Sequence, residues 1–174
     1  MAIQGAPDIT FQFGGSYSSG PTPGVYHVIV NESSLGTAQK TGRPFTALDL
    51  FGKDDPNNPA KNGKRITKQR VYGTMVGDDK EKADTMKGMA KRTFCDGYGM
   101  KWPAEEKALD PRQLVGKSAW ILIGPKKNEE TGEIRNEVLA VAQDQAKLPK
   151  VNTAPVPGLP NGAPTNGTPA RSRR

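Results

Sequence analysis

The chain contains one cysteine, Cys95, and one histidine, His27. A single cysteine excludes an intramolecular disulfide framework, which is typical of proteins in a reducing compartment. These two residues are also too few for a structural zinc site, which takes four such ligands. We therefore expect no metal and no cofactor. His27 and Cys95 are expected to be packing residues, within a strand and at the end of a helix.

Long apolar runs are absent as well, and hydrophobic residues make up only 34% of the chain. No run approaches the roughly 18 residues that a membrane helix needs. The first residues, MAIQGAPD, have neither the basic start nor the apolar stretch of a secretory signal. Glycine (20) and proline (15) are abundant, which favours a small core with disordered ends. We expect no membrane association.

Signatures of catalysis are missing too. There is no G-x-x-x-x-G-K-[ST] phosphate loop, and one histidine and one cysteine do not supply a catalytic triad at known spacings. Carboxylates do occur in pairs, at Asp54–Asp55, Asp78–Asp79, Glu105–Glu106 and Glu129–Glu130. Each pair lies in a hydrophilic turn or at a helix start, where solvation or capping explains it better than a nuclease metal site. We predict a protein without enzymatic activity.

The order of predicted elements is the most informative feature that is present. Three strand-like runs, one amphipathic helix and two further strand-like runs follow one another: VYHVIV from Val25, RPFTALDLF from Arg43, KRITKQRVYG from Lys64, DKEKADTMKGMAKRTF from Asp79, SAWILIG from Ser118 and RNEVLAVA from Arg135. This is the chain order of the five-stranded oligonucleotide- and oligosaccharide-binding (OB) barrel. We therefore predict a mainly β fold with one helix, an OB-like five-stranded barrel of order β-β-β-α-β-β.

The helix prediction depends on one apolar stripe at three- and four-residue spacing. Its members are Ala83, Met86, Met89, Ala90, Thr93 and Phe94. Asp78 or Asp79 is suited to cap the start, and Gly97 to close the end. We expect the stripe to be buried in the core.

Composition divides the chain into three parts. Residues 1–23 are predicted to be a flexible N-terminal arm, in which ITFQF suits a short edge strand. Residues 24–148 are predicted to form one OB-like domain, which we expect to bind nucleic acid through the residues described next. Residues 149–174 are a disordered, Pro/Gly-rich tail that carries four basic residues and no acid, out of a net charge of +7.

A basic, aromatic-interleaved segment suggests the binding site. Between Lys40 and Arg70 there are eight basic residues and only three acidic ones, and a glycine- and asparagine-rich stretch at 51–64 is predicted to be a long flexible loop. The candidate nucleic-acid-binding residues are Lys40, Arg43, Phe45, Phe51, Lys53, Lys64, Arg65, Lys68, Arg70 and Tyr72. Cations can follow phosphates while aromatic planes stack on bases, which tolerates any sequence.

Period-two alternation assigns these side chains to faces. On the second strand it groups Phe45, Ala47, Asp49 and Phe51; on the third it groups Ile66, Lys68, Arg70 and Tyr72, with Arg65, Thr67, Gln69 and Val71 opposite. Core packing is an equal alternative for Phe45 and Phe51. Trp120, within an apolar strand, is expected in the core, whereas Trp102 suits either packing over a barrel end or stacking on a base.

The stretch from about Val25 to Ala142 resembles a bacteriophage family catalogued as a domain of unknown function and regarded as single-stranded-DNA-binding proteins. The matching pieces are the early strand, Thr41–Arg43, the lysine-rich helix ending near Gly97–Gly99, Leu114–Lys117 and Thr131–Val138. The resemblance implies an OB-like fold and a role in phage DNA replication and recombination in the cytoplasm of the host bacterium. Phage replication or recombination proteins would then be partners, and self-association into a homo-oligomer stays open.

One departure separates the chain from many single-stranded-DNA-binding proteins. Those proteins end in an acidic tail that recruits partners, whereas this chain ends ARSRR. A basic tail is expected to add to nucleic-acid affinity instead. The alternative function is a phage structural or assembly protein whose Gly/Pro-rich arms order on neighbouring subunits.

Overall fold

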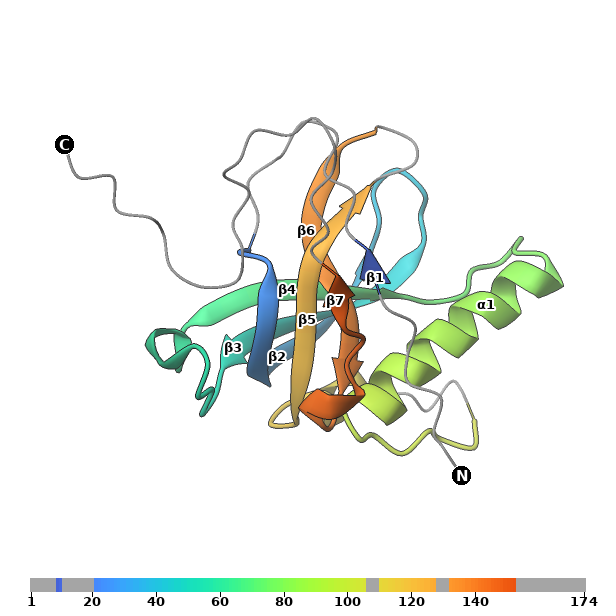
Figure 1. Ribbon diagram of the computed structural model, residues 1–174. Helices are drawn as coiled ribbons and strands as arrows, with labels where there is room; N and C mark the ends of the chain where they lie inside the picture. The colour runs from blue at the N-terminus through green and yellow to red at the C-terminus, as the bar shows by residue number, and fades with distance from the viewer. Residues whose placement is uncertain (1–8, 11–20, 106–109, 128–131, 153–174) are drawn as a thin grey trace, which may run out of the picture.

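The computed structural model describes residues 9–10, 21–105, 110–127 and 132–152. Its centre is a five-stranded antiparallel sheet with the neighbour order β4-β3-β2-β5-β6 (Figure 1). The strands are β2 (Gly24–Thr37), β3 (Pro44–Gly52), β4 (Arg65–Tyr72), β5 (Ser118–Lys127) and β6 (Ile134–Ala142). The predicted mainly β fold and its element order are therefore confirmed. Within the described residues β4 and β6 do not pair with each other, so the sheet is not closed.

The long strand β2 connects the two halves of the sheet. Its first part, Gly24–Ile29, pairs with β5, and its later part, Val28–Thr37, pairs with β3. The register with β3 shifts between Val30 and Glu32, which leaves Asn31 as an extra residue. A bulge of this kind bends a strand and increases its twist. The sheet therefore curves around its apolar face.

The main core lies on that inner face. It is built from alternate strand residues and from the segment after the helix, chiefly Tyr26, Val28, Val30, Leu48, Leu50, Ile121, Ile123, Phe94 and Tyr98. Tyr98 is almost fully buried, and its hydroxyl donates to Oε1 of Gln69 on β4 over 2.7 Å. Burial raises the pKa of this hydroxyl, so Tyr98 stays a neutral hydrogen-bond donor inside the core.

The predicted helix is present as α1 (Lys80–Lys91), which continues as a π-helical turn, Arg92–Gly97. Asp79 is the N-cap, and its carboxylate accepts from the backbone N–H of Lys82 over 2.8 Å. The expectation of a fully buried stripe is wrong, because Met89 is 52% exposed and Ala90 is the one buried residue of α1. Only the C-terminal end of α1 reaches the sheet, and the other end points away from it (Figure 1).

Gly97 allows the π-helical turn to touch β6. A Cβ atom at this position would lie 2.8 Å from Cγ1 of Val141, which is closer than side chains tolerate. The segment therefore fills the gap at the open side of the sheet, with α1 contacting β4 and the π-helical turn contacting β6. Among the described residues there are also three short 3-10 turns: Pro59–Lys61, Pro111–Leu114 and Gln145–Lys147.

A second, smaller apolar cluster lies on the outer face of the sheet. It contains Leu122, Ala142 and Leu148, with the half-buried Trp120 packed against it. Trp120 was expected in the core. Its place on the other face follows from the alternation along β5, in which Ala119 and Ile121 point to the main core.

The two ends of the described chain meet in a small parallel pair, β1 (Ile9–Thr10) with β7 (Val151–Asn152). The edge strand expected within ITFQF is thus partly confirmed. Its partner belongs to the tail that was predicted to be disordered, so that prediction is wrong at 151–152. The rest of both predicted arms, 1–8, 11–20 and 153–174, lies outside the described residues. In the ranges that the structure describes, no helix combines the length and apolar character needed to cross a membrane.

Candidate nucleic-acid interface

The candidate interface is the outer face of β3 and β4. The register pairs Phe45 with Tyr72, Ala47 with Arg70, and Asp49 with Lys68. Residues opposite each other in an antiparallel pair point to the same face. The other face carries Leu48, Leu50 and Val71, which belong to the main core. The predicted grouping of the basic and aromatic side chains on one face is therefore confirmed for these three pairs.

The alternation along β4 breaks at Ile66. Leu50 pairs with Thr67 and Phe51 with Arg65, so Ile66 is an extra residue, and its side chain packs against the main core. Arg65 turns to the outer face, where Nη2 lies 2.7 Å from Oδ1 of Asp49. The predicted faces of Ile66 and Arg65 are therefore reversed. The bulge adds one cation to the candidate interface.

An aromatic pair lies at one end of this face. The rings of Phe45 and Tyr72 meet edge to face, with centroids 5.8 Å apart and planes at 67°. Tyr72 is 36% exposed, Phe45 is half-buried, and neither belongs to a core cluster. Gly36 on β2 makes room for this arrangement, because a Cβ atom there would lie 2.6 Å from Cζ of Phe45. Phe45 is thus a surface aromatic, not a core residue.

Charge on the face is mixed, with a basic excess on β3 and β4. Three cations, Arg65, Lys68 and Arg70, face the single carboxylate of Asp49. Asp49 lies 2.7 Å from Arg65 and 4.0 Å from Lys68, so it partly neutralises both. Arg70 instead lies over the ring of Phe45. Glu32, which pairs with Asp49 from β2, is exposed beside them.

The segment from Phe51 to Lys64 was predicted to be a flexible loop, but the structure shows a loop held by one buried carboxylate. Asp55 is 1% exposed and accepts hydrogen bonds from the backbone N–H groups of His27, Asn57 and Asn58 at 2.9–3.2 Å. Nδ2 of Asn58 also donates to Asp55 over 3.1 Å. The loop is therefore fixed to β2. Its cations, Lys53, Lys61 and Lys64, are exposed, and so is the predicted Lys40 in the turn between β2 and β3.

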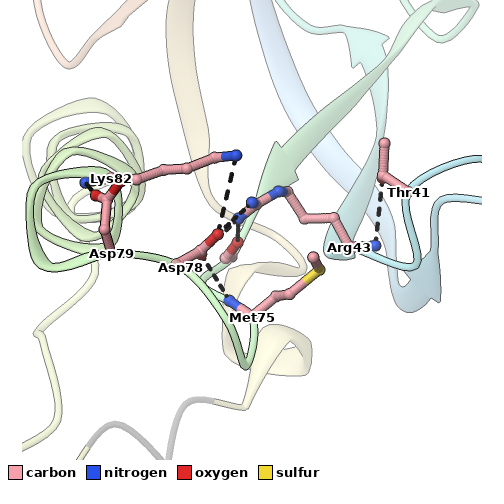
Figure 2. Close-up of polar contacts among 7 residues, drawn as sticks. Thr41, Arg43, Met75, Asp78, Asp79 and Lys82 are labelled. Atoms are coloured by element: carbon pink, nitrogen blue, oxygen red, sulfur yellow. Dashed lines mark hydrogen bonds and ion pairs between the residues drawn. The ribbon is translucent and has the colours of Figure 1, made fainter.

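Arg43 has a structural position that its sequence context does not indicate. Its guanidinium is buried and donates twice to the carboxylate of Asp78, over 2.6 and 2.9 Å, and once to the carbonyl of Gly73 (Figure 2). The bonds from Arg43 and from the backbone N–H of Met75 hold the pKa of Asp78 at about 2. This pair fastens the start of β3 to the segment before α1. We leave Arg43 out of the candidate interface because its guanidinium is buried and paired with Asp78.

A cleft of about 290 Å³ opens between the sheet and α1. Its apolar lining includes Val71, Ala90, Phe94 and Trp102, together with Phe45, Tyr72 and Leu35, which is 72% exposed. Trp102 packs against the main core, and Nζ of Lys91 lies 5.7 Å from its ring centroid. Of the two alternatives for Trp102, the structure shows packing at the open side of the sheet.

Two half-buried aromatic side chains on the outer face were not among the predicted site residues. His27 on β2 pairs with Trp120 on β5, and their ring centroids are 4.7 Å apart. Alternation along VYHVIV already separates His27 from the core residues Tyr26 and Val28. The contact with Trp120, however, depends on the β2–β5 pairing, which the sequence pattern does not reveal.

Three of the paired carboxylates make contacts that stabilise the fold. Asp55 holds the loop, Asp78 binds Arg43 and Asp79 caps α1, while Glu106 and Glu129–Glu130 lie outside the described residues. Over the described ranges, no group of three or more His, Cys, Asp or Glu side chains is placed to hold a metal ion.

No protein-family model matches the chain, and no curated protein is significantly similar to it. The evidence on function is therefore the chemistry of the outer face, which presents flat rings and cations to solvent. Those groups suit a ligand that has both phosphates and planar bases.

Proposed function

We propose that the protein binds single-stranded DNA, largely independently of base sequence, through the outer face of β3 and β4. The observation that carries the proposal is the cluster of Phe45, Tyr72 and Arg70, in which two surface rings and a guanidinium lie together beside further cations. Each stacked base contributes about 1–3 kcal/mol, and every base has a face that stacks. Such a surface retains a strand without reading its sequence.

We also propose that the sheet is an opened OB-like barrel. The neighbour order β4-β3-β2-β5-β6 is that of such a barrel cut between its third and fifth strands, and α1 with the π-helical turn occupies the cut. In OB folds the second and third strands carry the oligonucleotide. These correspond to β3 and β4, the strands that carry the candidate interface.

The biological role follows from the same proposal. A non-enzymatic protein that coats single strands would serve phage DNA replication and recombination in the cytoplasm of the host bacterium. The resemblance of the turns at Thr41–Arg43 and Gly97–Gly99 supports this role, together with the surface chemistry of β3 and β4. Phage replication or recombination proteins are the expected partners.

Titration of labelled oligonucleotides tests the proposed function. We expect micromolar or tighter binding to oligo-dT, weaker binding to a duplex of equal length, and a log–log salt slope of about −0.7 per neutralised phosphate. A parallel titration of oligo-U compares DNA with RNA. Equal affinity for single and double strands, or none for either, contradicts the proposal. A large DNA-free assembly in gel filtration without oligonucleotide binding favours the structural or assembly protein instead.

A double variant locates the site. Lys68→Ala with Arg70→Ala should weaken oligo-dT binding and flatten the salt slope, because two phosphate-neutralising charges are lost. Lys80→Ala with Arg92→Ala removes equal charge from exposed positions of the helical segment and is the matched control. Both variants should fold, since exposed charges contribute little to stability. Normal binding by the first variant places the site elsewhere.

A further inference from the structure

We propose that the bound strand continues across the sheet from β3 and β4 to a second stacking position, the His27–Trp120 pair on β2 and β5. This inference rests on the proposed function, because it extends the same surface. It adds two residues and a direction to the path of the nucleic acid.

The strand register places the pair on the same face as the candidate interface. Phe51 on β3 pairs with Ile29 on β2, and His27 precedes Ile29 by two residues on the same strand. His27 in turn pairs with Trp120 on β5. Side chains that are directly opposite, or two residues apart on one strand, share a face. The neighbours that alternate with them, Tyr26, Val28, Ala119 and Ile121, point into the main core.

The two rings are held in position before any ligand binds. Their centroids are 4.7 Å apart, with planes at 36°. Nδ1 of His27 lies 2.5 Å from the carbonyl oxygen of Lys53, and Trp120 packs against the outer apolar cluster at Leu122 and Leu148. Both rings are half-buried, so part of each stays accessible. A fixed aromatic side chain loses little conformational freedom when a base stacks on it.

The loop that contacts His27 also carries cations. Lys53, whose carbonyl contacts His27, is exposed, and so are Lys61 and Lys64 in the same loop. Asp55 holds the loop against β2 by accepting from the backbone N–H of His27. The loop cations are therefore anchored to the strand that carries His27. This charge suits a polyanion and argues for nucleic acid as the occupant.

The distance between the two aromatic positions sets the length of strand that reaches both. Lys53 lies beside His27, because its backbone N–H donates to the carbonyl oxygen of His27. The chain from Phe45 to Lys53 therefore gives the separation of the two positions, about 26 Å at ~3.3 Å per residue. Phe51 lies half-buried on this path, and Arg65, Lys68 and Arg70 lie beside it. A stretched single strand covers roughly 6–7 Å per nucleotide, about twice the duplex rise. Four to five nucleotides, within the usual ~4–16 of an OB site, therefore connect the two ends.

Fluorescence of Trp120 tests the inference in the full-length chain. Trp102→Phe leaves Trp120 as the one tryptophan, and titration with dT12 should quench its emission. The reciprocal variant, Trp120→Phe, reports on Trp102, which lines the same cleft as Phe45 and Tyr72, so any quenching in that variant belongs to the first position. Affinity of Trp120→Leu with His27→Ala for dT12 should fall at least about fivefold, whereas Trp120→Phe keeps a stacking ring and most of the affinity.

The outcomes separate this inference from the proposed function. If the unmodified chain binds dT12 and Tyr72→Ala weakens binding, but Trp120 emission and the affinity of the double variant are unchanged, the second position is wrong and the first stands. If the unmodified chain does not bind dT12, the proposed function fails. Thermal unfolding of each variant identifies any loss of affinity that comes from disturbed packing. The fluorescence titration of Trp102→Phe keeps the native His27 and Trp120.

Discussion

The guanidinium carbon of Arg70 lies 4.8 Å from the centroid of the Phe45 ring, across the β3–β4 pair. Tyr72 meets the same ring from its edge. A cation over an aromatic face restrains both groups. The arrangement therefore holds a planar cation and two rings at the surface, where a base and a phosphate can meet them together.

Removing this guanidinium should weaken binding of oligo-dT more than removal of a simple charge. Arg70→Ala loses a phosphate contact and the restraint on Phe45, so we expect affinity to fall by about 5- to 150-fold, the range of one stacked base. Arg70→Lys keeps the charge without the planar group and should recover only the salt-dependent part. Fluorescence anisotropy at two salt concentrations measures both effects. Equal affinities of Arg70→Lys and the unmodified chain would show that stacking is not involved.

The acids beside the cations should oppose binding. Asp49→Asn releases Arg65 and Lys68 from their shared carboxylate, and Glu32→Gln removes the neighbouring charge on β2. Each change should raise affinity for oligo-dT and steepen the salt slope, because more phosphates can be neutralised. Urea unfolding should change little, since exposed ion pairs contribute about 0–1 kcal/mol. Unchanged or weaker binding by both variants would place the strand away from this face.

The Arg43–Asp78 pair should make stability depend on acid pH. The pKa of the Asp78 carboxyl is lowered from its ordinary 3.8 to about 2, first by the hydrogen bond from Arg43 and then by that from Met75. The folded state therefore binds this proton less readily than the unfolded state. The stabilisation is fully present above pH ~4 and is lost as pH falls from ~4 to ~2.

Asp78→Asn isolates this contribution. The variant should be less stable than the unmodified chain at pH 7, and the difference should shrink as pH falls from ~4 to ~2. Urea unfolding monitored at several pH values gives the comparison. Asp79→Asn is the matched control, because it changes an adjacent carboxylate that caps α1 and does not contact Arg43 in the described contacts. A difference that is constant with pH would mean that the ion pair does not contribute.

Much of the fold follows from local patterns, because strand and helix periods are local properties of the chain. The runs from Val25, Arg43 and Lys64 become β2, β3 and β4, and the stripe beginning at Ala83 becomes α1. The burial of individual side chains on α1 was less predictable. Met89 lies at a stripe position yet is exposed, because only the end of α1 reaches the sheet.

The predictions that were wrong or incomplete at the candidate site concern contacts between residues that are distant in the sequence. The bulge at Ile66, which reverses the predicted face of Arg65, is defined by pairing with β3 and not by the sequence of β4. Arg43 sits in a basic segment, but its partner Asp78 lies 35 residues away. The His27–Trp120 contact likewise requires two strands from opposite ends of the domain to be neighbours.

Gly36 should be required for the aromatic surface although it touches no ligand itself. In Gly36→Ala the new Cβ would lie 2.6 Å from Cζ of Phe45, so the ring must turn away. Because the obstacle is the far end of a side chain, the fold should tolerate the change, whereas oligo-dT affinity should fall about fivefold or more. Gly88→Ala, with open space around its Cβ, should bind normally and stabilise α1 by up to about 1 kcal/mol. If Gly36→Ala binds oligo-dT as well as Gly88→Ala, then the position of the Phe45 ring does not matter for binding.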